Sequence, residues 1–214
     1  MTKFAIAALA GLATAASAQV LSTGPGGGSA GIATVDIRDV ANVTFTRGTG
    51  NVLVTIEFTS DVATWDLVSD PDNVVFDLDL GGGMQATMHG IGWDVTIQSL
   101  GASWLSEARM YFDDNIAPDL SGLFLAPGVA DSFAGAGSYN SGGILDLGDN
   151  GIPDIVLPNG HLRLEFYESF DDVANAIDGF YLAGSVLTLD MTIVPAPGAL
   201  ALLGLGGLAI RRRR

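Results

Sequence analysis

The segment from residue 146 to residue 154 carries the sharpest local pattern of chemically useful side chains. It reads Asp-Leu-Gly-Asp-Asn-Gly-Ile-Pro-Asp, which supplies three carboxylates and one amide oxygen. Calcium takes several oxygen ligands from a tightly turned loop, and glycine permits the turn. The alternative is a polar turn at Asn150-Gly151 that joins two short strands. As a calcium site, the segment would use Asp146, Asp149, Asn150 and Asp154 as ligands.

The same segment resembles the Asp-rich calcium loops of thrombospondin-type repeats. The resemblance rests on the pattern Asp-x-x-Asp-Asn-Gly-x-x-Asp and implies Ca²⁺ as a bound ion. The chain does not repeat the loop, and the loop lacks the alternate ligand spacing and the bidentate Glu of an EF-hand. No other cofactor is expected.

Residue types that could catalyse a reaction form no recognisable set. Asp113-Asp114 and Asp171-Asp172 are adjacent carboxylates, but neighbours on a strand point to opposite faces, whereas a glycosidase needs two carboxylates facing one cleft. The histidines, His89 and His161, lie far apart, and the chain has no cysteine and no Gly-x-Ser-x-Gly motif. The chain is therefore expected not to be an enzyme, with a hydrolase of dispersed carboxylates as the minor alternative.

Aromatic side chains supply a second kind of candidate, because rings of this type stack on sugars in lectins. Trp104 follows Gly101-Ala102-Ser103 in a predicted loop, and Tyr139 lies in a Gly-rich segment, so these two are the candidate ligand residues. The alternative for each tryptophan is a place in the core. Trp93 is assigned to the core because it continues an apolar stripe with Val95 and Ile97.

The elements that must position these residues are predicted to be β-strands. Apolar and polar residues alternate with a period of two, which is typical of strands with one buried face. Turn sequences such as Arg47-Gly48-Thr49-Gly50-Asn51 separate these runs. The residues expected to point inward are Val52, Val54, Ile56, Phe58, Val74, Phe76, Leu78, Trp93, Val95, Ile97, Leu164, Phe166, Leu189 and Met191.

Half-buried strands joined by short turns favour antiparallel pairing, and about eight of them favour two stacked sheets. The predicted fold is all-β, a single antiparallel β-sandwich or jelly-roll-like domain over residues 32–193, with a closed barrel as the alternative. Residues 113–160 break the alternation and are expected to form a long loop. The best candidate for a short helix is residues 169–177, where Phe170, Val173 and Ile177 fall at helical spacing.

Residues 1–18 have the layout of a secretory signal peptide. Lys3 precedes an apolar stretch, and small residues stand at Ala16 and Ala18, so cleavage would leave Gln19 as the first residue. Residues 19–31 are rich in glycine and are expected to form a linker. This layout predicts a helical signal segment and export by the secretion machinery.

Residues 194–214 follow a different pattern. An apolar run from Gly198 to Ile210 lies between a proline-rich segment and an arginine cluster. A bilayer core takes about 20 helical residues, so this expected hydrophobic helix is marginal as a permanent span. The arginines would stay on the cytoplasmic side. An ordinary short tail anchor is one interpretation. The residues concerned are Val194, Pro195, Ala196 and Pro197, followed at the end by Arg211, Arg212, Arg213 and Arg214.

The order of these three parts resembles the PEP-CTERM sorting signal, which has a Pro-x-Pro motif, an apolar segment and a terminal Arg cluster and is recognised by an exosortase. The resemblance covers residues 194–214 only, and Ala196 stands where the family usually has Glu. It implies an exosortase-like sorting protease as partner and transient anchoring in the inner membrane. It also implies a final place in the cell envelope, on the outer surface or in the extracellular matrix.

The charge of the mature body limits its partners. Residues 19–194 hold four arginines against 24 acidic residues, a formal net charge of −20. Such a body is not expected to bind nucleic acid, anionic lipid or other polyanions, whose binding is driven by Lys and Arg. Two functions fit: a non-catalytic envelope or matrix protein associated with exopolysaccharide, or a secreted carbohydrate-binding module with or without calcium.

Overall fold

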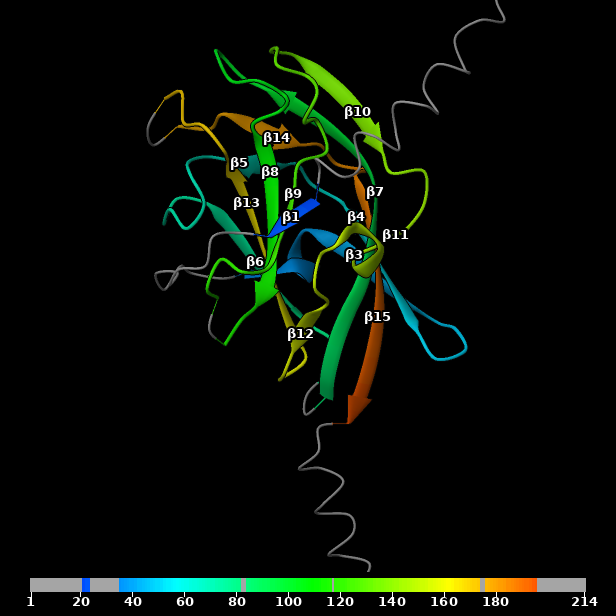
Figure 1. Cartoon of the computed structure of the whole chain (residues 1–214). Helices are drawn as coiled ribbons and strands as arrows, with labels where there is room; N and C mark the ends of the chain where they lie inside the picture. The colour runs from blue at the N-terminus through cyan, green and yellow to red at the C-terminus, as the bar shows by residue number, and fades with distance from the viewer. Residues whose placement is uncertain (1–20, 24–34, 82–83, 117, 174–175, 196–214) are drawn as a thin grey trace, which may run out of the picture.

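Alternating apolar and polar residues form strands where the sequence predicts them. The computed structural model describes residues 21–23, 35–81, 84–116, 118–173 and 176–195. This part of the chain is all-β, apart from two short 3-10 helices, η1 (Ile37–Asp39) and η2 (Gly148–Asn150). Its strands form two sheets that pack face to face, so the predicted β-sandwich is confirmed (Figure 1). The predicted signal helix and C-terminal helix lie outside the described residues.

The first sheet, sheet A, contains six strands and is antiparallel except for the pairing of its last two strands. The strand β13 forms its centre and pairs with β8 on one side and β6 on the other. In spatial order the strands are β1 (Leu21–Thr23), β9 (Leu123–Leu125), β8 (Ala108–Asp114), β13 (His161–Glu168), β6 (Val74–Asp79) and β2 (Val35–Asp36). The residues of β1 fall within the predicted Gly-rich linker.

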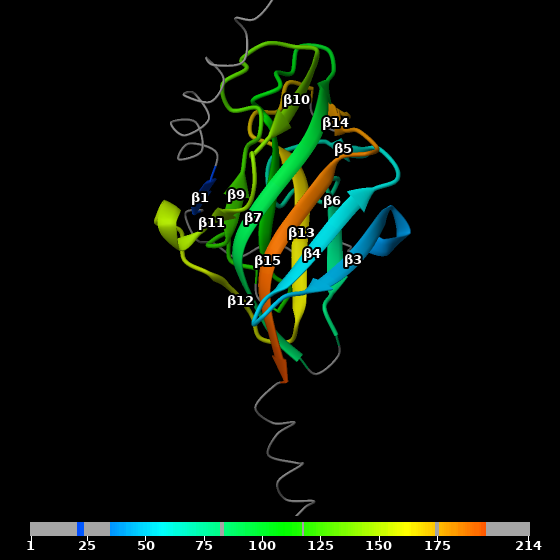
Figure 2. The same cartoon turned by 90° about the vertical axis from the view of Figure 1, so that its right-hand side faces the viewer.

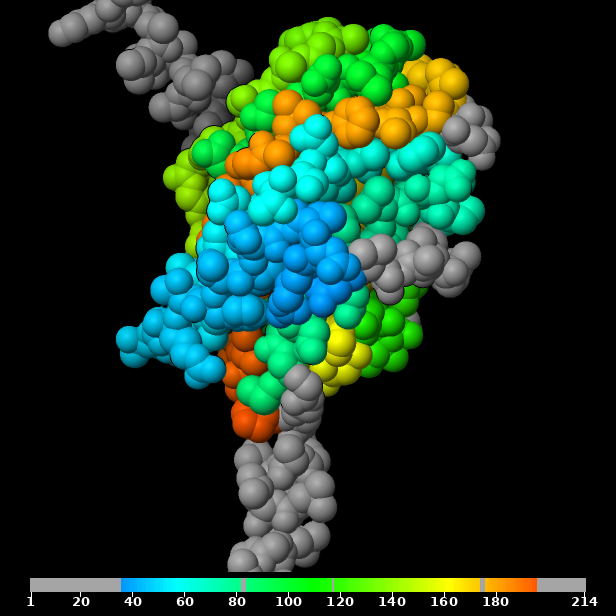
Figure 3. Space-filling view, turned by 180° about the vertical axis from the view of Figure 1, so that it is seen from behind, coloured from blue at the N-terminus to red at the C-terminus, as the bar shows by residue number. Residues whose placement is uncertain are grey.

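The second sheet, sheet B, is organised around two long strands, β7 and β15, and faces the viewer in Figure 2. All ten residues of β15 pair with β7, and β4 pairs with the other edge of β15. The main path is β3 (Ala41–Arg47), β4 (Val52–Phe58), β15 (Val186–Pro195), β7 (Met84–Ser99), β14 (Gly179–Tyr181) and β5 (Val62–Thr64). Seen from behind, the β3–β4 hairpin stands out beside the end of β15 (Figure 3).

The core lies between the two sheets. Phe166 of sheet A bridges them, because its ring meets Phe58 and Tyr181 of sheet B and Phe76 of its own sheet, with centroids 5.5, 5.1 and 5.8 Å away. All the residues predicted to point inward are buried except Val52 and Val74, which are half-buried and pack against the core.

Residues 113–160 do not form the long loop that the sequence predicts. They contribute β9 to sheet A, and three short strands pair in turn with the free edge of β7. These strands are β10 (Ala136–Asn140), β11 (Leu145–Asp146) and β12 (Ile155–Leu157). Backbone hydrogen bonds to β7 hold them, so they need little of the apolar alternation by which strands are recognised.

The outer face of β13 is buried, although the alternation predicts it to be wet. Arg163 and Glu165 are 3% and 0% exposed, and their Nη2 and Oε2 atoms lie 2.7 Å apart. The loop that joins β5 to β6 covers them: the backbone N–H of Ser69 and the side chain of Asn73 both donate to Glu165. The two charged residues therefore fix this loop on sheet A instead of facing solvent.

The predicted helix at residues 169–177 is also absent from the described part of that segment, where residues 169–173 and 176–177 form bends and irregular backbone. Phe170 and Val173 are 61% and 55% exposed, so this segment does not have the buried apolar face that stabilises a short helix in a protein.

Candidate functional site

The loop predicted to bind calcium forms a hydrogen-bonded turn. Asp146 accepts from the backbone N–H of Asp149 at 2.9 Å, and the Asn150 amide donates to the backbone oxygen of Asp146 at 2.7 Å. Gly151 permits the turn, since its φ is 73°. The Asp154 carboxylate lies apart, 2.8 Å from the Nδ1 atom of His89.

These carboxylates are not among those that meet at metal-ligand distance. Within the described residues, one group of three carboxylates has ligand atoms within 4.8 Å of one another, and it contains none of Asp146, Asp149 and Asp154. The loop has the internal hydrogen bonds of a polar turn, and calcium binding by it stays a prediction.

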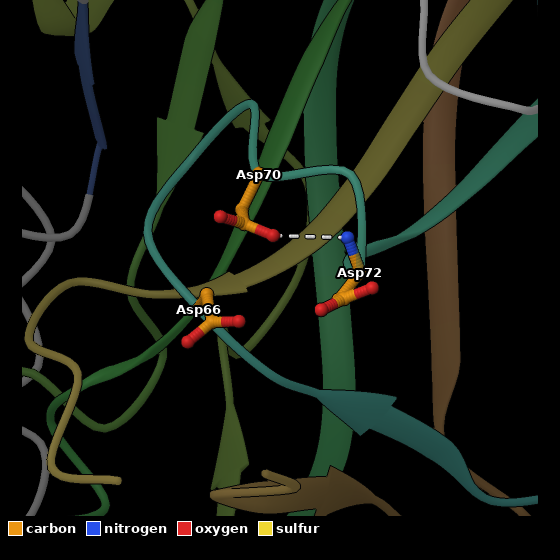
Figure 4. A group of neighbouring side chains, drawn as sticks. All are labelled: Asp66, Asp70 and Asp72. Atoms are coloured by element: carbon orange, nitrogen blue, oxygen red, sulfur yellow. Dashed lines mark hydrogen bonds between the residues drawn. The ribbon is translucent and has the colours of Figure 1, made fainter. Parts of the chain in front are cut away.

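The group that does converge is Asp66, Asp70 and Asp72, on the loop between β5 and β6 (Figure 4). The backbone N–H of Asp72 donates to Asp70 at 2.9 Å, and Asn73 ties the loop to Leu67 and Glu165. Carboxylate oxygens are the ligands that a hard divalent cation prefers, so these three residues could hold one. Sequence reasoning missed the group, because the run Ser69-Asp70-Pro71-Asp72-Asn73 has the composition of an ordinary turn.

Tyr139 is not available as an exposed ligand platform. Its ring packs against the core, and its hydroxyl donates to Asp131 at 2.8 Å. Burial raises the pKa of Tyr139, and the neighbouring Asp131 raises it further. The residue therefore anchors β10 to the preceding loop.

Trp104 is 45% exposed and stands on the loop that joins β7 to β8. Its backbone N–H donates to the Glu107 carboxylate at 2.6 Å, and the Glu107 N–H donates back to the Trp104 carbonyl at 3.0 Å. The next residue, Leu105, is fully buried and anchors the loop in the core. The indole is thus presented to solvent on a fixed turn.

A cavity of about 450 Å³, here called the aromatic cavity, opens beside this indole. Phe170 contributes a second exposed ring to it, and the Ser169 N–H ties that segment to the Glu107 carbonyl at 2.9 Å. Phe170 was missed as a site residue because its spacing suggested a buried helix face. The cavity is lined by Ala102, Trp104, Glu107, Phe170 and Asp172.

Two buried carboxyl groups lie close to the aromatic cavity without lining it. Glu168 is fully buried and accepts a hydrogen bond from the Thr64 hydroxyl. Burial raises the pKa of Glu168 to about 8; the hydrogen bond from Thr64 opposes the shift, and the charge of Asp178 adds to it. Burial likewise raises the pKa of Asp178. Neither group is among the residues that line the cavity.

Of the predicted sorting residues, the structure describes Val194 and Pro195. Both belong to β15 and pair with Gln85 and Met84 of β7. The other sorting residues and the cleavage residues Ala16, Ala18 and Gln19 lie outside the described ranges. Among the described residues, no helix has the length and apolar character needed to cross a membrane.

Comparison with known structures gives weak similarities, of which two are described here. No protein-family model matches the chain, and no curated protein matches it. A crystal structure of the infectious bursal disease virus VP2 subviral particle aligns with a TM-score of 0.30 and 12% identity over 67% of this chain and 36% of that one. A structure of the infectious bursal disease virus Gt strain aligns with a TM-score of 0.25 and 11% identity, over 81% of this chain and 35% of that one. The chain thus spans about a third of the length of these proteins.

Proposed function

We propose that this chain is an exported, non-catalytic β-sandwich protein of the cell envelope or extracellular matrix, and that it binds polysaccharide. The aromatic cavity is the observation that carries the proposal, because exposed Trp104 and Phe170 stand there beside Glu107 and Asp172. Aromatic faces pack on sugar rings, and carboxylates accept hydrogen bonds from sugar hydroxyls. The body has a formal charge of −20 and repels polyanions, so the expected ligand is an uncharged glycan.

The two ends of the sequence support the location. Residues 1–18 have the layout of a secretory signal, and residues 194–214 resemble a sorting signal handled by an exosortase-like protease. During sorting, the apolar segment would hold the protein in the inner membrane for a time.

The aromatic cavity and the start of the tail lie at opposite poles of the sandwich. The tail follows Pro195, which pairs with Met84 at the beginning of β7, whereas Trp104 follows Ser99 at the end of β7. In Figure 1, β15 ends at the bottom, while β14, which pairs with the end of β7, lies at the top. Sixteen strand residues at about 3.3 Å each separate the poles by roughly 50 Å. A domain held by its tail would therefore display the cavity away from the membrane.

Trp104→Ala is expected to weaken glycan binding by about 30-fold or more, since loss of a central aromatic contact costs about 2 kcal/mol. A glycan array identifies the ligand, and calorimetry with that oligosaccharide measures the Kd of each variant. Phe45→Ala is the matched control, because Phe45 is 42% exposed but lies at the other pole. Equal binding by wild type and Trp104→Ala, or no saturable binding to any glycan, would count against the proposal.

Processing at both ends is expected to remove both terminal signals. Mass spectrometry of the envelope fraction should find Gln19 as the first residue and no peptide that reaches Arg214. Mature envelope protein that retains Arg211 to Arg214 would rule out sorting cleavage and leave the simple tail anchor.

A further inference from the structure

Both exposed arginines in the described part of the chain line the same cavity. These are Arg38 and Arg47, and the cavity, here called the arginine cavity, has a volume of about 660 Å³. The other two arginines described lie on the outer face of sheet A: Arg163 is buried against Glu165, and Arg109 is half-buried beside Tyr167. The positive charge that this acidic body offers to a ligand is therefore concentrated at one cavity.

The arginine cavity combines this charge with an apolar wall. The β3–β4 hairpin, residues 79–81 at the end of β6, the start of β7 and the end of β15 surround it on the side that Figure 3 shows. The apolar side chains come from each of these parts: Phe45 and Val52 from the hairpin, Leu80 from residues 79–81, Met84 from the start of β7, and Ile193 from β15.

The two guanidinium groups differ in what holds them. Arg38 donates through Nη2 to the backbone oxygen of Asp79 at 2.7 Å, and its Nη1 lies 3.6 Å from the Asp36 carboxylate. The guanidinium group of Arg47 makes no hydrogen bond or ion pair with any described residue, and only the backbone of Arg47 is paired, with Val52 of β4. Asp79 also lines the cavity, but its carboxylate accepts from the Gly81 N–H at 2.8 Å and lies 3.8 Å from His161. Arg38 is thus held in place, and Arg47 is available to an anion.

The position of the cavity indicates where that anion comes from. Ile193 lines the cavity, and the apolar tail segment begins at Gly198, five residues further along. Five extended residues span at most about 17 Å. With the tail in a bilayer, the arginine cavity would lie at the level of the lipid headgroups.

We propose that the arginine cavity binds an anionic phospholipid of the membrane in which the tail is anchored, which rests on the proposed anchoring stage. The phosphate would pair with Arg47 and Arg38, because a guanidinium presents donors that match phosphate oxygens. The apolar wall would take up the first part of an acyl chain. Such a contact gives an acidic body, which an anionic surface otherwise repels, a fixed orientation on that surface.

The test uses the full chain in a neutral detergent and three probes: dihexanoylphosphatidylglycerol, dihexanoylphosphatidylcholine and inorganic phosphate. Calorimetry should show saturable binding of the phosphatidylglycerol, at least ten times tighter than that of either other probe. Arg47→Gln should weaken it at least tenfold, and Arg47→Lys should weaken it less. Ser60→Glu is the matched control, since it changes the net charge by the same amount at an exposed site beyond the far end of β4. It should change the Kd less than threefold.

Three results would overturn the assignment. They are equal binding of the two lipids, equal binding of inorganic phosphate and phosphatidylglycerol, and an equal effect of Ser60→Glu and Arg47→Gln. Glycan binding and tail processing are measured on the same preparations. Arg47→Gln should leave glycan binding unchanged, so failure of the polysaccharide proposal or of the anchoring proposal is distinguishable from failure of this site.

Discussion

Phe166→Ala is expected to lower the free energy of unfolding by about 3–5 kcal/mol, a large share of the 5–15 kcal/mol that holds an ordinary domain together. Phe166 is fully buried and its ring meets three other rings from both sheets. Removing it opens a cavity where the sheets pack and also removes edge-to-face contacts, which add about 0.5–1.5 kcal/mol each. Urea unfolding followed by tryptophan fluorescence measures the loss.

Phe170→Ala is the control, because it makes the same chemical change four residues further on at a ring that is 61% exposed. Its effect should stay within about 0.5 kcal/mol. If the two variants were equally stable, Phe166 would not be the bridge between the sheets.

Glu168→Gln is expected to make the protein more stable at pH 8 and to reduce the dependence of its stability on pH. Burial raises the pKa of Glu168 to about 8 from a usual value of 4.5, so the folded state holds a proton that the unfolded state releases between these values. The contribution of this carboxyl is fully present below pH 4.5 and is lost as the pH rises towards 8. A shift of the pKa from 4.5 to about 8 corresponds to roughly 5 kcal/mol. Glutamine has no ionisable proton, so the Glu168→Gln protein avoids that cost.

The unfolding free energies of the wild type and the Glu168→Gln variant at pH 4.5, 6 and 8 test this prediction. The difference between them should increase with pH. Glu57→Gln is the matched control, since it removes the same charge from an exposed position on β4. The prediction would fail if this difference in unfolding free energy were constant with pH, or if Glu57→Gln produced the same difference. Either result would show that the stabilisation comes from reduced repulsion within the acidic body and not from the burial of Glu168.

The sequence predicts those strands that bury one face on the core. Val54, Ile56 and Phe58 alternate with polar residues, and the structure buries all three. The same alternation predicts that Arg163 and Glu165 are exposed, because they alternate with apolar residues of β13. Their cover comes from a loop about 90 residues earlier in the chain, and no local pattern can reveal a contact of that range.

The strands that pair with β7 were missed for a related reason. They approach so closely that a side chain at Gly90 or Gly92 would place its Cβ 2.9 Å from the backbone oxygen of Leu145 or Gly143. The pair Gly90-Gly92 inside an apolar run was the available sign that another backbone lies there.

The candidate sites also differ in whether the local sequence can reveal them. Trp104 is a candidate from the sequence because a large aromatic residue in a polar loop stands out locally, and the structure places it at a cavity. The position of Phe170 at the same cavity could not be predicted locally, because it depends on how two separate loops meet. The aspartates at 146–154 have the residue types of a calcium loop, but backbone hydrogen bonds determine where their oxygens lie, and residue spacing alone does not give that geometry.

The pairing of β15 has a mechanical consequence for a protein attached at both poles. With its tail in a membrane and a polysaccharide bound at the aromatic cavity, tension would run along β15 and β7, which are antiparallel and paired over all ten residues of β15. A force along the strands acts in shear, so the interstrand hydrogen bonds must break together. A force across the strands would instead open them one after another. Single-molecule pulling from residue 195 and residue 104 should therefore require a higher rupture force than pulling across the edge of sheet B.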